Sequence, residues 1–314
     1  MTFDVLILGS NSSIPAHGRH PTAQVVNHND QLFLVDCGEG TQMRMDALRV
    51  RRSRIHHIFI SHLHGDHYYG LIGLLTTFHL LQRRAPLHIF SPPGLEEIIH
   101  LHFRYSETQL VYPVHFHTFS GQDVEQLYES ETLVVSTLPM QHRIPCCGFL
   151  FREKPMPRRI RPDAVERYRL QPEHIRLLRE GKDLEWNGSF WKNEDLTLDP
   201  LPPAVYACCS DTRYDESLAA LIAGADLLYH EATFLSDLAD RAALTHHSTA
   251  AQAAELARKA GVSQLLLGHF GSRYTHLDPV LKEARAVFPN TRLALEGQRF
   301  AVRQAAVAQG SMNG

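Results

Sequence analysis

The sequence has few lysines, few cysteines and no long hydrophobic run. It contains five lysines against 26 arginines, and its formal net charge at pH 7 is −3. This near balance excludes nucleic-acid binding driven by an overall positive charge, although a local basic patch stays possible. No segment approaches the ~20 continuous apolar residues that a membrane-spanning helix needs, so we expect no membrane span.

The five cysteines are an odd number, include two adjacent pairs and have no Cys-x-x-Cys spacing. This use is typical of structural thiols in a reducing compartment and argues against a zinc knuckle. The first residues, MTFDVLILGSNSS, interrupt their apolar run with Asp4 and carry no basic leader. They indicate a first strand rather than a signal peptide, so we expect a cytoplasmic protein.

Short apolar runs alternate with amphipathic stretches along most of the chain, which is long enough to bury a full core. The strand-like runs are 3–8, 31–35, 55–60, 87–90, 132–138, 204–207, 225–229 and 264–267. Helical spacing of Leu, Ile and Ala occurs at 69–82, 215–223, 249–260 and 280–287. Because short turns separate the early strands, the pattern predicts a layered α/β fold with partly antiparallel sheets.

Residues 152–182 break this pattern. The segment has ten basic and five acidic residues, three prolines near its start and few large apolar residues. Its composition favours an excursion from the core, either as a solvated charged surface helix or as a partner-binding element. The tail at 304–314 is small and polar, and we expect it to fray.

Histidine is abundant, with 21 copies, and the most informative stretch of the chain is Ser61-His62-Leu63-His64-Gly65-Asp66-His67. It follows the predicted strand at 55–60. Three imidazoles and a carboxylate within six residues are the ligand types that Zn²⁺ prefers. Alternate residues of a compact loop can face different ways, which favours two neighbouring metals over one. A solvated loop is the alternative.

Two metals need more ligands than this loop supplies. Polar residues also follow three other predicted strands: His142, Asp211 and His269. Each alone would fit a turn or a satisfied polar group. Their repeated position just after a strand indicates a shared site.

These residues together resemble the metallo-β-lactamase superfamily. The segments DCGEGTQ at 36–42, SDT at 210–212, HEAT at 230–233, HST at 247–249 and GHFGSRY at 268–274 resemble one branch, ribonuclease Z, the tRNA 3′-processing endonuclease. The resemblance runs from about residue 3 to about residue 300. It implies a single domain over 1–314 with a metallo-β-lactamase-like four-layer αββα sandwich and a protruding basic arm inserted at about 152–195.

The resemblance implies a zinc-dependent endoribonuclease that cleaves the 3′ trailer from precursor tRNA by metal-activated water attack on a phosphodiester. It implies two Zn²⁺ per chain, with Mn²⁺ possible. One ion would be held by His62, His64 and His142, the other by Asp66, His67 and His269, with Asp211 as the bridge. The arm would bind the tRNA, and the chain would form a homodimer as family members typically do.

Further roles also follow from the resemblance. Asp66 would orient the attacking water, and His247, held by Glu231, would protonate the leaving oxygen. Arg273 and Ser272 would bind the phosphate. Without the resemblance, His247 would be a helix-start residue beside the Ser248/Thr249 cap, and Arg273 would fit a surface ion pair equally well.

Two other functions stay open. The first is a phosphodiesterase of the same fold that acts on a small molecule. The second is an RNA-binding protein with structural zinc, which is disfavoured because structural zinc usually has four closed, Cys-rich ligands.

Three positions depart from the family pattern. Residues 170–175 read Leu-Gln-Pro-Glu-His-Ile where the family arm has a Gly-Pro pair. Residues 14–21 lack the lysine of a Pro-x-Lys-x-Arg-Asn pattern linked to rejection of CCA-ending tRNA, so this discrimination is not carried over. Gly271 stands where serine is usual.

Overall fold

The computed structural model describes residues 2–186 and 188–303, and the expected fraying at 304–314 lies outside them. The described chain divides into two compact units. The first comprises the residues before 129, residues 135–151 and the residues after 203. The second comprises residues 129–134 and 152–203.

The first large sheet has seven strands in the order β18-β1-β2-β3-β4-β5-β6. Its strands are β1 (Phe3–Gly9), β2 (Ala23–His28), β3 (Gln31–Val35), β4 (Ile55–Phe59), β5 (Leu87–Ser91), β6 (Val114–Thr118) and β18 (Arg299–Ala301). Neighbouring strands from β18 to β3 are antiparallel, whereas those from β3 to β6 are parallel. The predicted mixture of strand directions is therefore confirmed.

The second large sheet also has seven strands, in the order β17-β16-β15-β14-β9-β8-β7. Its strands are β7 (Gln126–Glu129), β8 (Leu133–Pro139), β9 (Cys147–Glu153), β14 (Val205–Cys209), β15 (Leu227–Glu231), β16 (Leu265–Gly268) and β17 (Thr291–Leu293). The four strands from β14 to β17 are parallel. Parallel neighbours end at the same edge, so the loops after them gather their side chains there.

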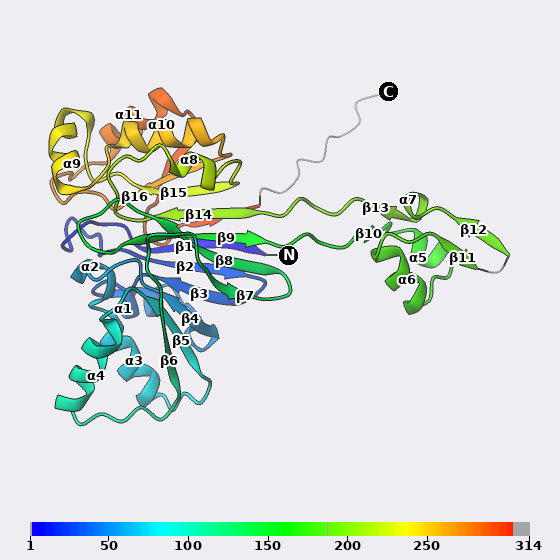
Figure 1. The fold of residues 1–314 in the computed structure, drawn as a ribbon, viewed down its shortest axis with the longest axis horizontal. Coiled ribbons are helices and arrows are strands. Elements are labelled where there is room, and N and C mark those ends of the chain that lie inside the picture. Colours follow the sequence, from blue (N-terminus) through cyan, green and yellow to red (C-terminus); the bar gives the residue numbers. More distant parts are fainter. Residues whose placement is uncertain (1, 187, 304–314) are drawn as a thin grey trace. The chain divides into compact units, whose positions relative to one another are not determined.

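Helices cover the outer face of each sheet, as Figure 1 shows for the first unit. The first sheet is covered by α1 (Thr41–Ala47), α2 (Gly65–Tyr68), α3 (Leu71–Leu80) and α4 (Leu95–Tyr105). The second is covered by α8 (Leu218–Leu221), α9 (Ala239–Thr245), α10 (Ala250–Ala260) and α11 (Asp278–Val287). The result is the predicted four-layer αββα sandwich. None of the helices in the described chain is long and apolar enough to cross a bilayer.

Each outer helix layer packs on its sheet through aliphatic side chains, and aromatic rings fill the space between the sheets. Phe59 of β4 meets Phe149 of β9 with ring centroids 5.4 Å apart, and Phe33 of β3 meets Phe151 at 5.8 Å. These rings are buried, and edge-on or tilted pairs of this kind each add about 0.5–1.5 kcal/mol beyond area burial. All five cysteines are buried and free, as expected of structural thiols.

The predicted strands are all present, with ends that differ by at most two residues. The helix predicted at 215–223 forms only as α8, because Asp215 accepts hydrogen bonds from the Ser217 backbone N–H (2.9 Å) and hydroxyl (2.7 Å) and so holds a turn before it. Helix α4 was not predicted, although its buried Leu95, Ile99 and Phe103 recur at four-residue spacing.

The second unit has a small core of its own. Its elements are β10 (Arg159–Ile160), α5 (Ala164–Arg167), α6 (Pro172–Arg179), β11 (Leu184–Trp186), β12 (Ser189–Trp191), α7 (Asn193–Leu196) and β13 (Thr197–Leu198). Leu170, Leu178, Leu184 and Leu196 are buried together. Where the family pattern has a Gly-Pro pair, Pro172 begins α6, and Gln171 and His174 form a reciprocal capping box.

Candidate metal centre

The loops that follow β4, β8, β14 and β16 bring seven metal-type side chains together. One group consists of His62, His64, His142 and Asp211, and a second of Asp66, His67 and His269. Within each group the ligand atoms all lie within 4.8 Å of one another. Every metal ligand suggested by the sequence therefore lies in one of these two groups.

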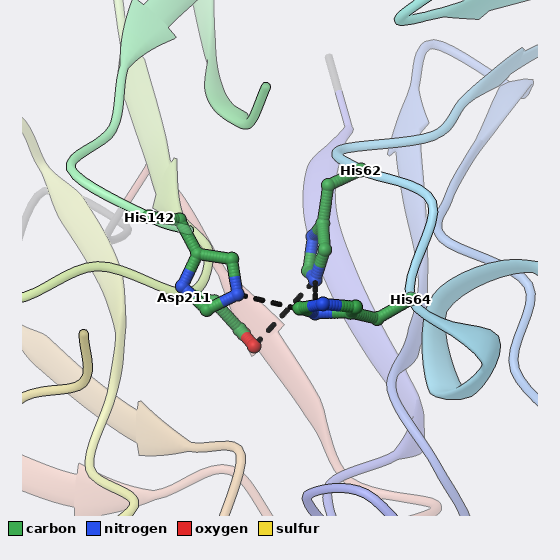
Figure 2. Close-up of side chains that lie close together, drawn as sticks. All are labelled: His62, His64, His142 and Asp211. Carbon is green, nitrogen blue, oxygen red and sulfur yellow. Dashed lines mark hydrogen bonds and ion pairs between the residues drawn. The ribbon is translucent and has the colours of Figure 1, made fainter. Parts of the chain in front are cut away.

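In the first group, three imidazoles converge from two loops on the carboxylate of Asp211 (Figure 2). His64 Nδ1 lies 3.0 Å from His62 Nε2 and 3.1 Å from His142 Nε2. Asp211 Oδ2 lies 3.7 Å from His62 Nε2. Burial, above all, lowers the pKa of His62 and brings the pKa of His142 to about 4, so both rings are neutral at pH 7, the form that binds metals.

Asp211 also faces the second group through its other oxygen. Its Oδ1 lies 3.5 Å from His67 Nε2 and 3.2 Å from His269 Nε2. Asp66 Oδ2 lies 3.6 Å and 3.4 Å from the same two nitrogens. One carboxylate thus faces both ligand groups, which is the arrangement that a pair of neighbouring cations requires.

Unpaired buried atoms indicate that this cluster fits metal ions. His67 Nε2, His269 Nε2 and Asp211 Oδ1 are buried and have no hydrogen-bond partner in the described chain. Such atoms cost free energy unless something else satisfies them. Asp211 Oδ1 lies within 3.5 Å of both imidazole nitrogens, and imidazole with carboxylate is a suitable donor set for Zn²⁺ or Mn²⁺.

The ligands are oriented by hydrogen bonds that the sequence did not predict. His67 Nδ1 lies 2.8 Å from Asp36 Oδ2, and His269 Nδ1 lies 2.9 Å from Thr233 Oγ1. Such contacts fix which ring nitrogen faces the metal. Asp36 follows β3 directly and has a left-handed backbone (φ 56°). Its position at a strand end is the same signal that identified His142, Asp211 and His269, and could have found it.

His247 lies beside the two groups and is paired with Glu231. The His247 Nδ1 atom is 2.8 Å from Glu231 Oε1 and 4.0 Å from Asp211 Oδ2. Burial opposes the charged imidazole, but the charge and hydrogen bond of Glu231, together with the charge of Asp211, outweigh burial and raise the pKa of His247 to about 9. Thr249 does cap α10, so the helix-start position and the contact with Glu231 coexist.

The residues suggested for phosphate binding lie further along the chain after β16. Arg273 is exposed, and its guanidinium stacks on the Phe234 ring with Cζ 4.7 Å from the centroid. Ser272 accepts a hydrogen bond from His17 Nε2 (2.8 Å) through its backbone carbonyl. At Gly271 a Cβ would lie 2.6 Å from the Thr233 carbonyl oxygen, so the usual serine would require the backbone to shift.

A cavity of about 500 Å³ opens over the centre. It is lined by Asp66, Asp211 and His247 and by three side chains not suggested by the sequence, namely Ser13, Glu39 and Arg143. The backbone N–H of Ser13 donates to Asp66 Oδ2 at 2.7 Å. The centre is therefore reachable from solvent, and Arg143 adds a positive charge to its mouth.

The comparisons with known proteins agree with this geometry. A Ribonuclease Z from Bacteroides fragilis is 48% identical over 295 residues, which covers 94% of this chain and 97% of the relative. The chain belongs to the ribonuclease Z family. The predictions of the family, of the metallo-β-lactamase fold and of an enzyme of the ribonuclease Z type are confirmed.

Two solved structures and one family profile complete the comparison. Human tRNase Z, short form, has a TM-score of 0.70 and 26% identity, and the match covers 96% of this chain and all of that one. The metallo-β-lactamase fold protein YhfI from Bacillus subtilis has a TM-score of 0.67 over 96% of this chain and all of that one, and at 18% identity it supports the fold alone. The profile described as "Anti-Pycsar protein Apyc1" matches residues 3–156.

Proposed function

We propose that this chain is a metal-dependent endoribonuclease that removes the 3′ trailer from precursor tRNA. The observation that carries the proposal is Asp211, whose two oxygens face two separate groups of ligands. A two-cation site of this kind suits hydrolysis of a phosphodiester. The relatives named Ribonuclease Z and tRNase Z support RNA, and tRNA in particular, as the substrate.

Two Zn²⁺ ions, or Mn²⁺ in their place, would be held by the residues that fit them. His62, His64 and His142 would bind one ion, Asp66, His67 and His269 the other, and Asp211 both. When bound, such a pair lowers the pKa of a water and stabilises the oxygens at phosphorus. The buried atoms that lack partners, His67 Nε2, His269 Nε2 and Asp211 Oδ1, support this assignment.

Two side chains of the protein, Asp66 and His247, would act on the attacking water and on the leaving oxygen. Asp66 accepts the Ser13 N–H and borders the cavity, so its carboxylate is positioned to orient the attacking water. His247 keeps Nδ1 on Glu231, which leaves the Nε2 proton for the leaving sugar oxygen. At neutral pH the charged His247 ring can serve as that acid.

The phosphate would be bound by side chains beside the metal centre, above all by Arg273. Arg273 stacks on Phe234, whose ring lies 6.1 Å from His247, and this stacking holds the guanidinium in one orientation. An arginine guanidinium binds two phosphate oxygens at once. Because the chain has only five lysines, arginines would make most of its phosphate contacts. Ser272 would add a weaker hydroxyl donor.

The second unit would serve as the tRNA-binding arm. Its Arg167, Arg169 and Arg179 are exposed and form no ion pair within the described residues, so they are free to neutralise phosphates. The second unit also has a polar cavity, which is a weaker candidate for binding the tRNA backbone. Its three basic residues, Arg158, Arg161 and Lys192, are balanced by Asp183, Glu194 and Asp199.

We also propose a cytoplasmic homodimer. We propose the cytoplasm because the proposed substrate is precursor tRNA. Large apolar side chains stand exposed on and around α3 and at the end of α4, where a second copy would cover them: Tyr69 at 66%, Leu80 at 69%, Leu81 at 65% and Tyr105 at 82% exposure. Sedimentation of the wild type and of Leu80→Glu tests this, because a charge in the interface would yield monomers.

The decisive experiment uses a precursor tRNA labelled at its 5′ end. We expect a single cut just after the discriminator base, abolished by a chelator and restored by Zn²⁺ or Mn²⁺. His247→Ala should bind metal but fail to cut, whereas the control His276→Ala, an exposed histidine outside the centre, should cut normally. A cut elsewhere would contradict the proposal. Turnover of only a small phosphodiester would indicate the alternative substrate class.

A further inference from the structure

Four histidines that have no part in the proposed centre gather on one face of the first sheet. His57 of β4 is in register with His88 of β5, and His88 with His115 of β6. His117 stands two residues further along β6, so it emerges on the same face as His115. The four rings form a cluster at the β6 edge of the sheet, which we call the edge histidine cluster.

Two of these rings approach each other as metal ligands do. His88 Nδ1 lies 2.9 Å from His117 Nε2. In the proposed catalytic centre the corresponding ring nitrogens are 3.0 Å and 3.1 Å apart. Two imidazole nitrogens on one tetrahedral Zn²⁺, with Zn–N near 2.0–2.1 Å, are separated by about 3.3 Å. A small rotation of either ring therefore admits an ion between them.

The neighbouring rings hold His88 and His117 in this arrangement. His88 stacks between His57 at 5.3 Å and His115 at 5.0 Å, and His117 stacks on Phe90 at 4.5 Å. Tyr128 of β7 packs edge-on against His57 with centroids 4.5 Å apart. His88 is half-buried and His117 exposed, so ions in solution can reach the pair.

The charge state also suits a metal. Within the described chain, none of the four histidines forms an ion pair with a carboxylate. Partial burial and the neighbouring imidazoles lower the pKa of both His88 and His117, so neutral rings, the form that binds metals, prevail at neutral pH. Two nitrogens this close cannot both carry protons, so at least one presents its lone pair to the other.

We propose that His88 and His117 form a separate binding site for a divalent transition-metal ion, with water molecules in the remaining coordination positions. Imidazole pairs suit Zn²⁺, Ni²⁺ and Cu²⁺ rather than Mg²⁺ or Ca²⁺. The site is exposed and has two protein ligands, so it differs in kind from the buried centre around Asp211. It would take up exchangeable metal without acting in the chemistry.

The test counts bound Zn²⁺ in the full-length, metal-loaded protein. After removal of free metal, titration calorimetry with ZnCl₂ should detect one further equivalent in the wild type. The double variant His88→Ala/His117→Ala should lose that equivalent. The matched control, His100→Ala/His102→Ala on the outer helix α4, should keep it. Thermal unfolding of both variants checks that the fold is intact.

A second readout identifies the ligands directly. Substoichiometric Cu²⁺ should broaden the imidazole NMR signals of His88 and His117 before those of His100 and His102. Uptake of the same number of Zn²⁺ ions by the wild type and by His88→Ala/His117→Ala would overturn the proposal. So would the absence of any further equivalent in the wild type, because the close pair would then be a hydrogen bond between two neutral rings. Neither result depends on RNA cleavage.

Discussion

His247 and Glu231 form a close pair in which Nδ1 of the imidazole lies 2.8 Å from Oε1 of the carboxylate. Glu231 is completely buried at the end of β15. It also accepts hydrogen bonds from the backbone N–H groups of Thr212 and Thr233, both at 3.1 Å, and from the Thr233 hydroxyl at 2.7 Å. Burial raises the pKa of Glu231, but the charge and hydrogen bond of His247 outweigh it and lower that pKa, and the carboxylate in turn favours the charged imidazole.

Glu231→Gln should therefore weaken His247 as an acid without removing it. The amide can still accept a hydrogen bond but carries no charge, so the pKa of His247 should fall from about 9. Wild-type cleavage of precursor tRNA should decline as the pH rises through that value. In the variant the decline should begin at lower pH, and the rate at neutral pH should drop by up to about 10²–10⁴-fold. Single-turnover pH profiles measure both effects.

The control for this prediction is the metal content. Glu231→Gln should retain as much metal as the wild type, because Glu231 is in neither of the two ligand groups around the bridge. Equal rates for variant and wild type across the pH range would contradict the role of the pair.

Asp211→Asn should reduce the metal content of the protein. The neutral amide keeps the shape of the side chain but removes the negative charge that faces both ligand groups. We expect loss of metal from both positions and loss of cleavage, with unfolding at a lower temperature when metal is present. Elemental analysis after dialysis measures this, and Asp215→Asn, a turn residue before α8, is the matched control. Full metal content in Asp211→Asn would refute the bridging role.

A triple variant tests the second unit as a tRNA-binding arm. Replacing Arg167, Arg169 and Arg179 with alanine should raise KM for precursor tRNA and make it less sensitive to salt, by up to about one unit of log–log slope for each lost phosphate contact. Turnover of a small phosphodiester should not change. The control replaces three exposed arginines of the first unit, Arg51, Arg84 and Arg104. An unchanged KM and salt slope would exclude these side chains as phosphate contacts.

The strands and the ligands could be predicted from the sequence because their signals are local. An apolar run such as 265–268, followed at once by His269, marks both a buried strand and a polar residue at its end. The compact loop from His62 to His67 likewise concentrates four ligands, three imidazoles and one carboxylate, within six residues. The position of Asp211 between two ligand groups was implied only by the family resemblance, since spacing along a chain does not give distances.

The contacts that the sequence did not predict join residues far apart in the chain. Asp36 and His67 are 31 residues apart, and Thr233 and His269 are 36 apart. No periodicity connects such pairs, which meet only because β3 and β15 lie next to β4 and β16 in their sheets. The edge histidine cluster was equally hidden, since His57, His88 and His117 come together only through strand register.

His57 should make the fold sensitive to acid. Burial, helped by His88 and the other neighbouring imidazoles, lowers the pKa of His57 from 6.5 to about 4. The unfolded chain therefore binds a proton between these pH values that the folded chain does not. The contribution of His57 to stability is complete above about pH 6.5 and is lost progressively as the pH falls toward 4. His57→Phe removes this titration and keeps an aromatic ring beside Phe33 and Tyr128.

The free energy of unfolding of both proteins should be measured in denaturant at about pH 7, above the window in which His57 takes up a proton, and at about pH 5, inside it. His57→Phe should lose less stability on acidification than the wild type does. The proposed metal ligands protonate equally in both proteins, so the difference between them isolates His57. His100→Phe, at an exposed site on α4, should behave like the wild type. If His57→Phe and the wild type lose the same free energy between the two pH values, then His57 has the same pKa in the folded and the unfolded chain, and its partial burial among aromatic rings does not set its protonation.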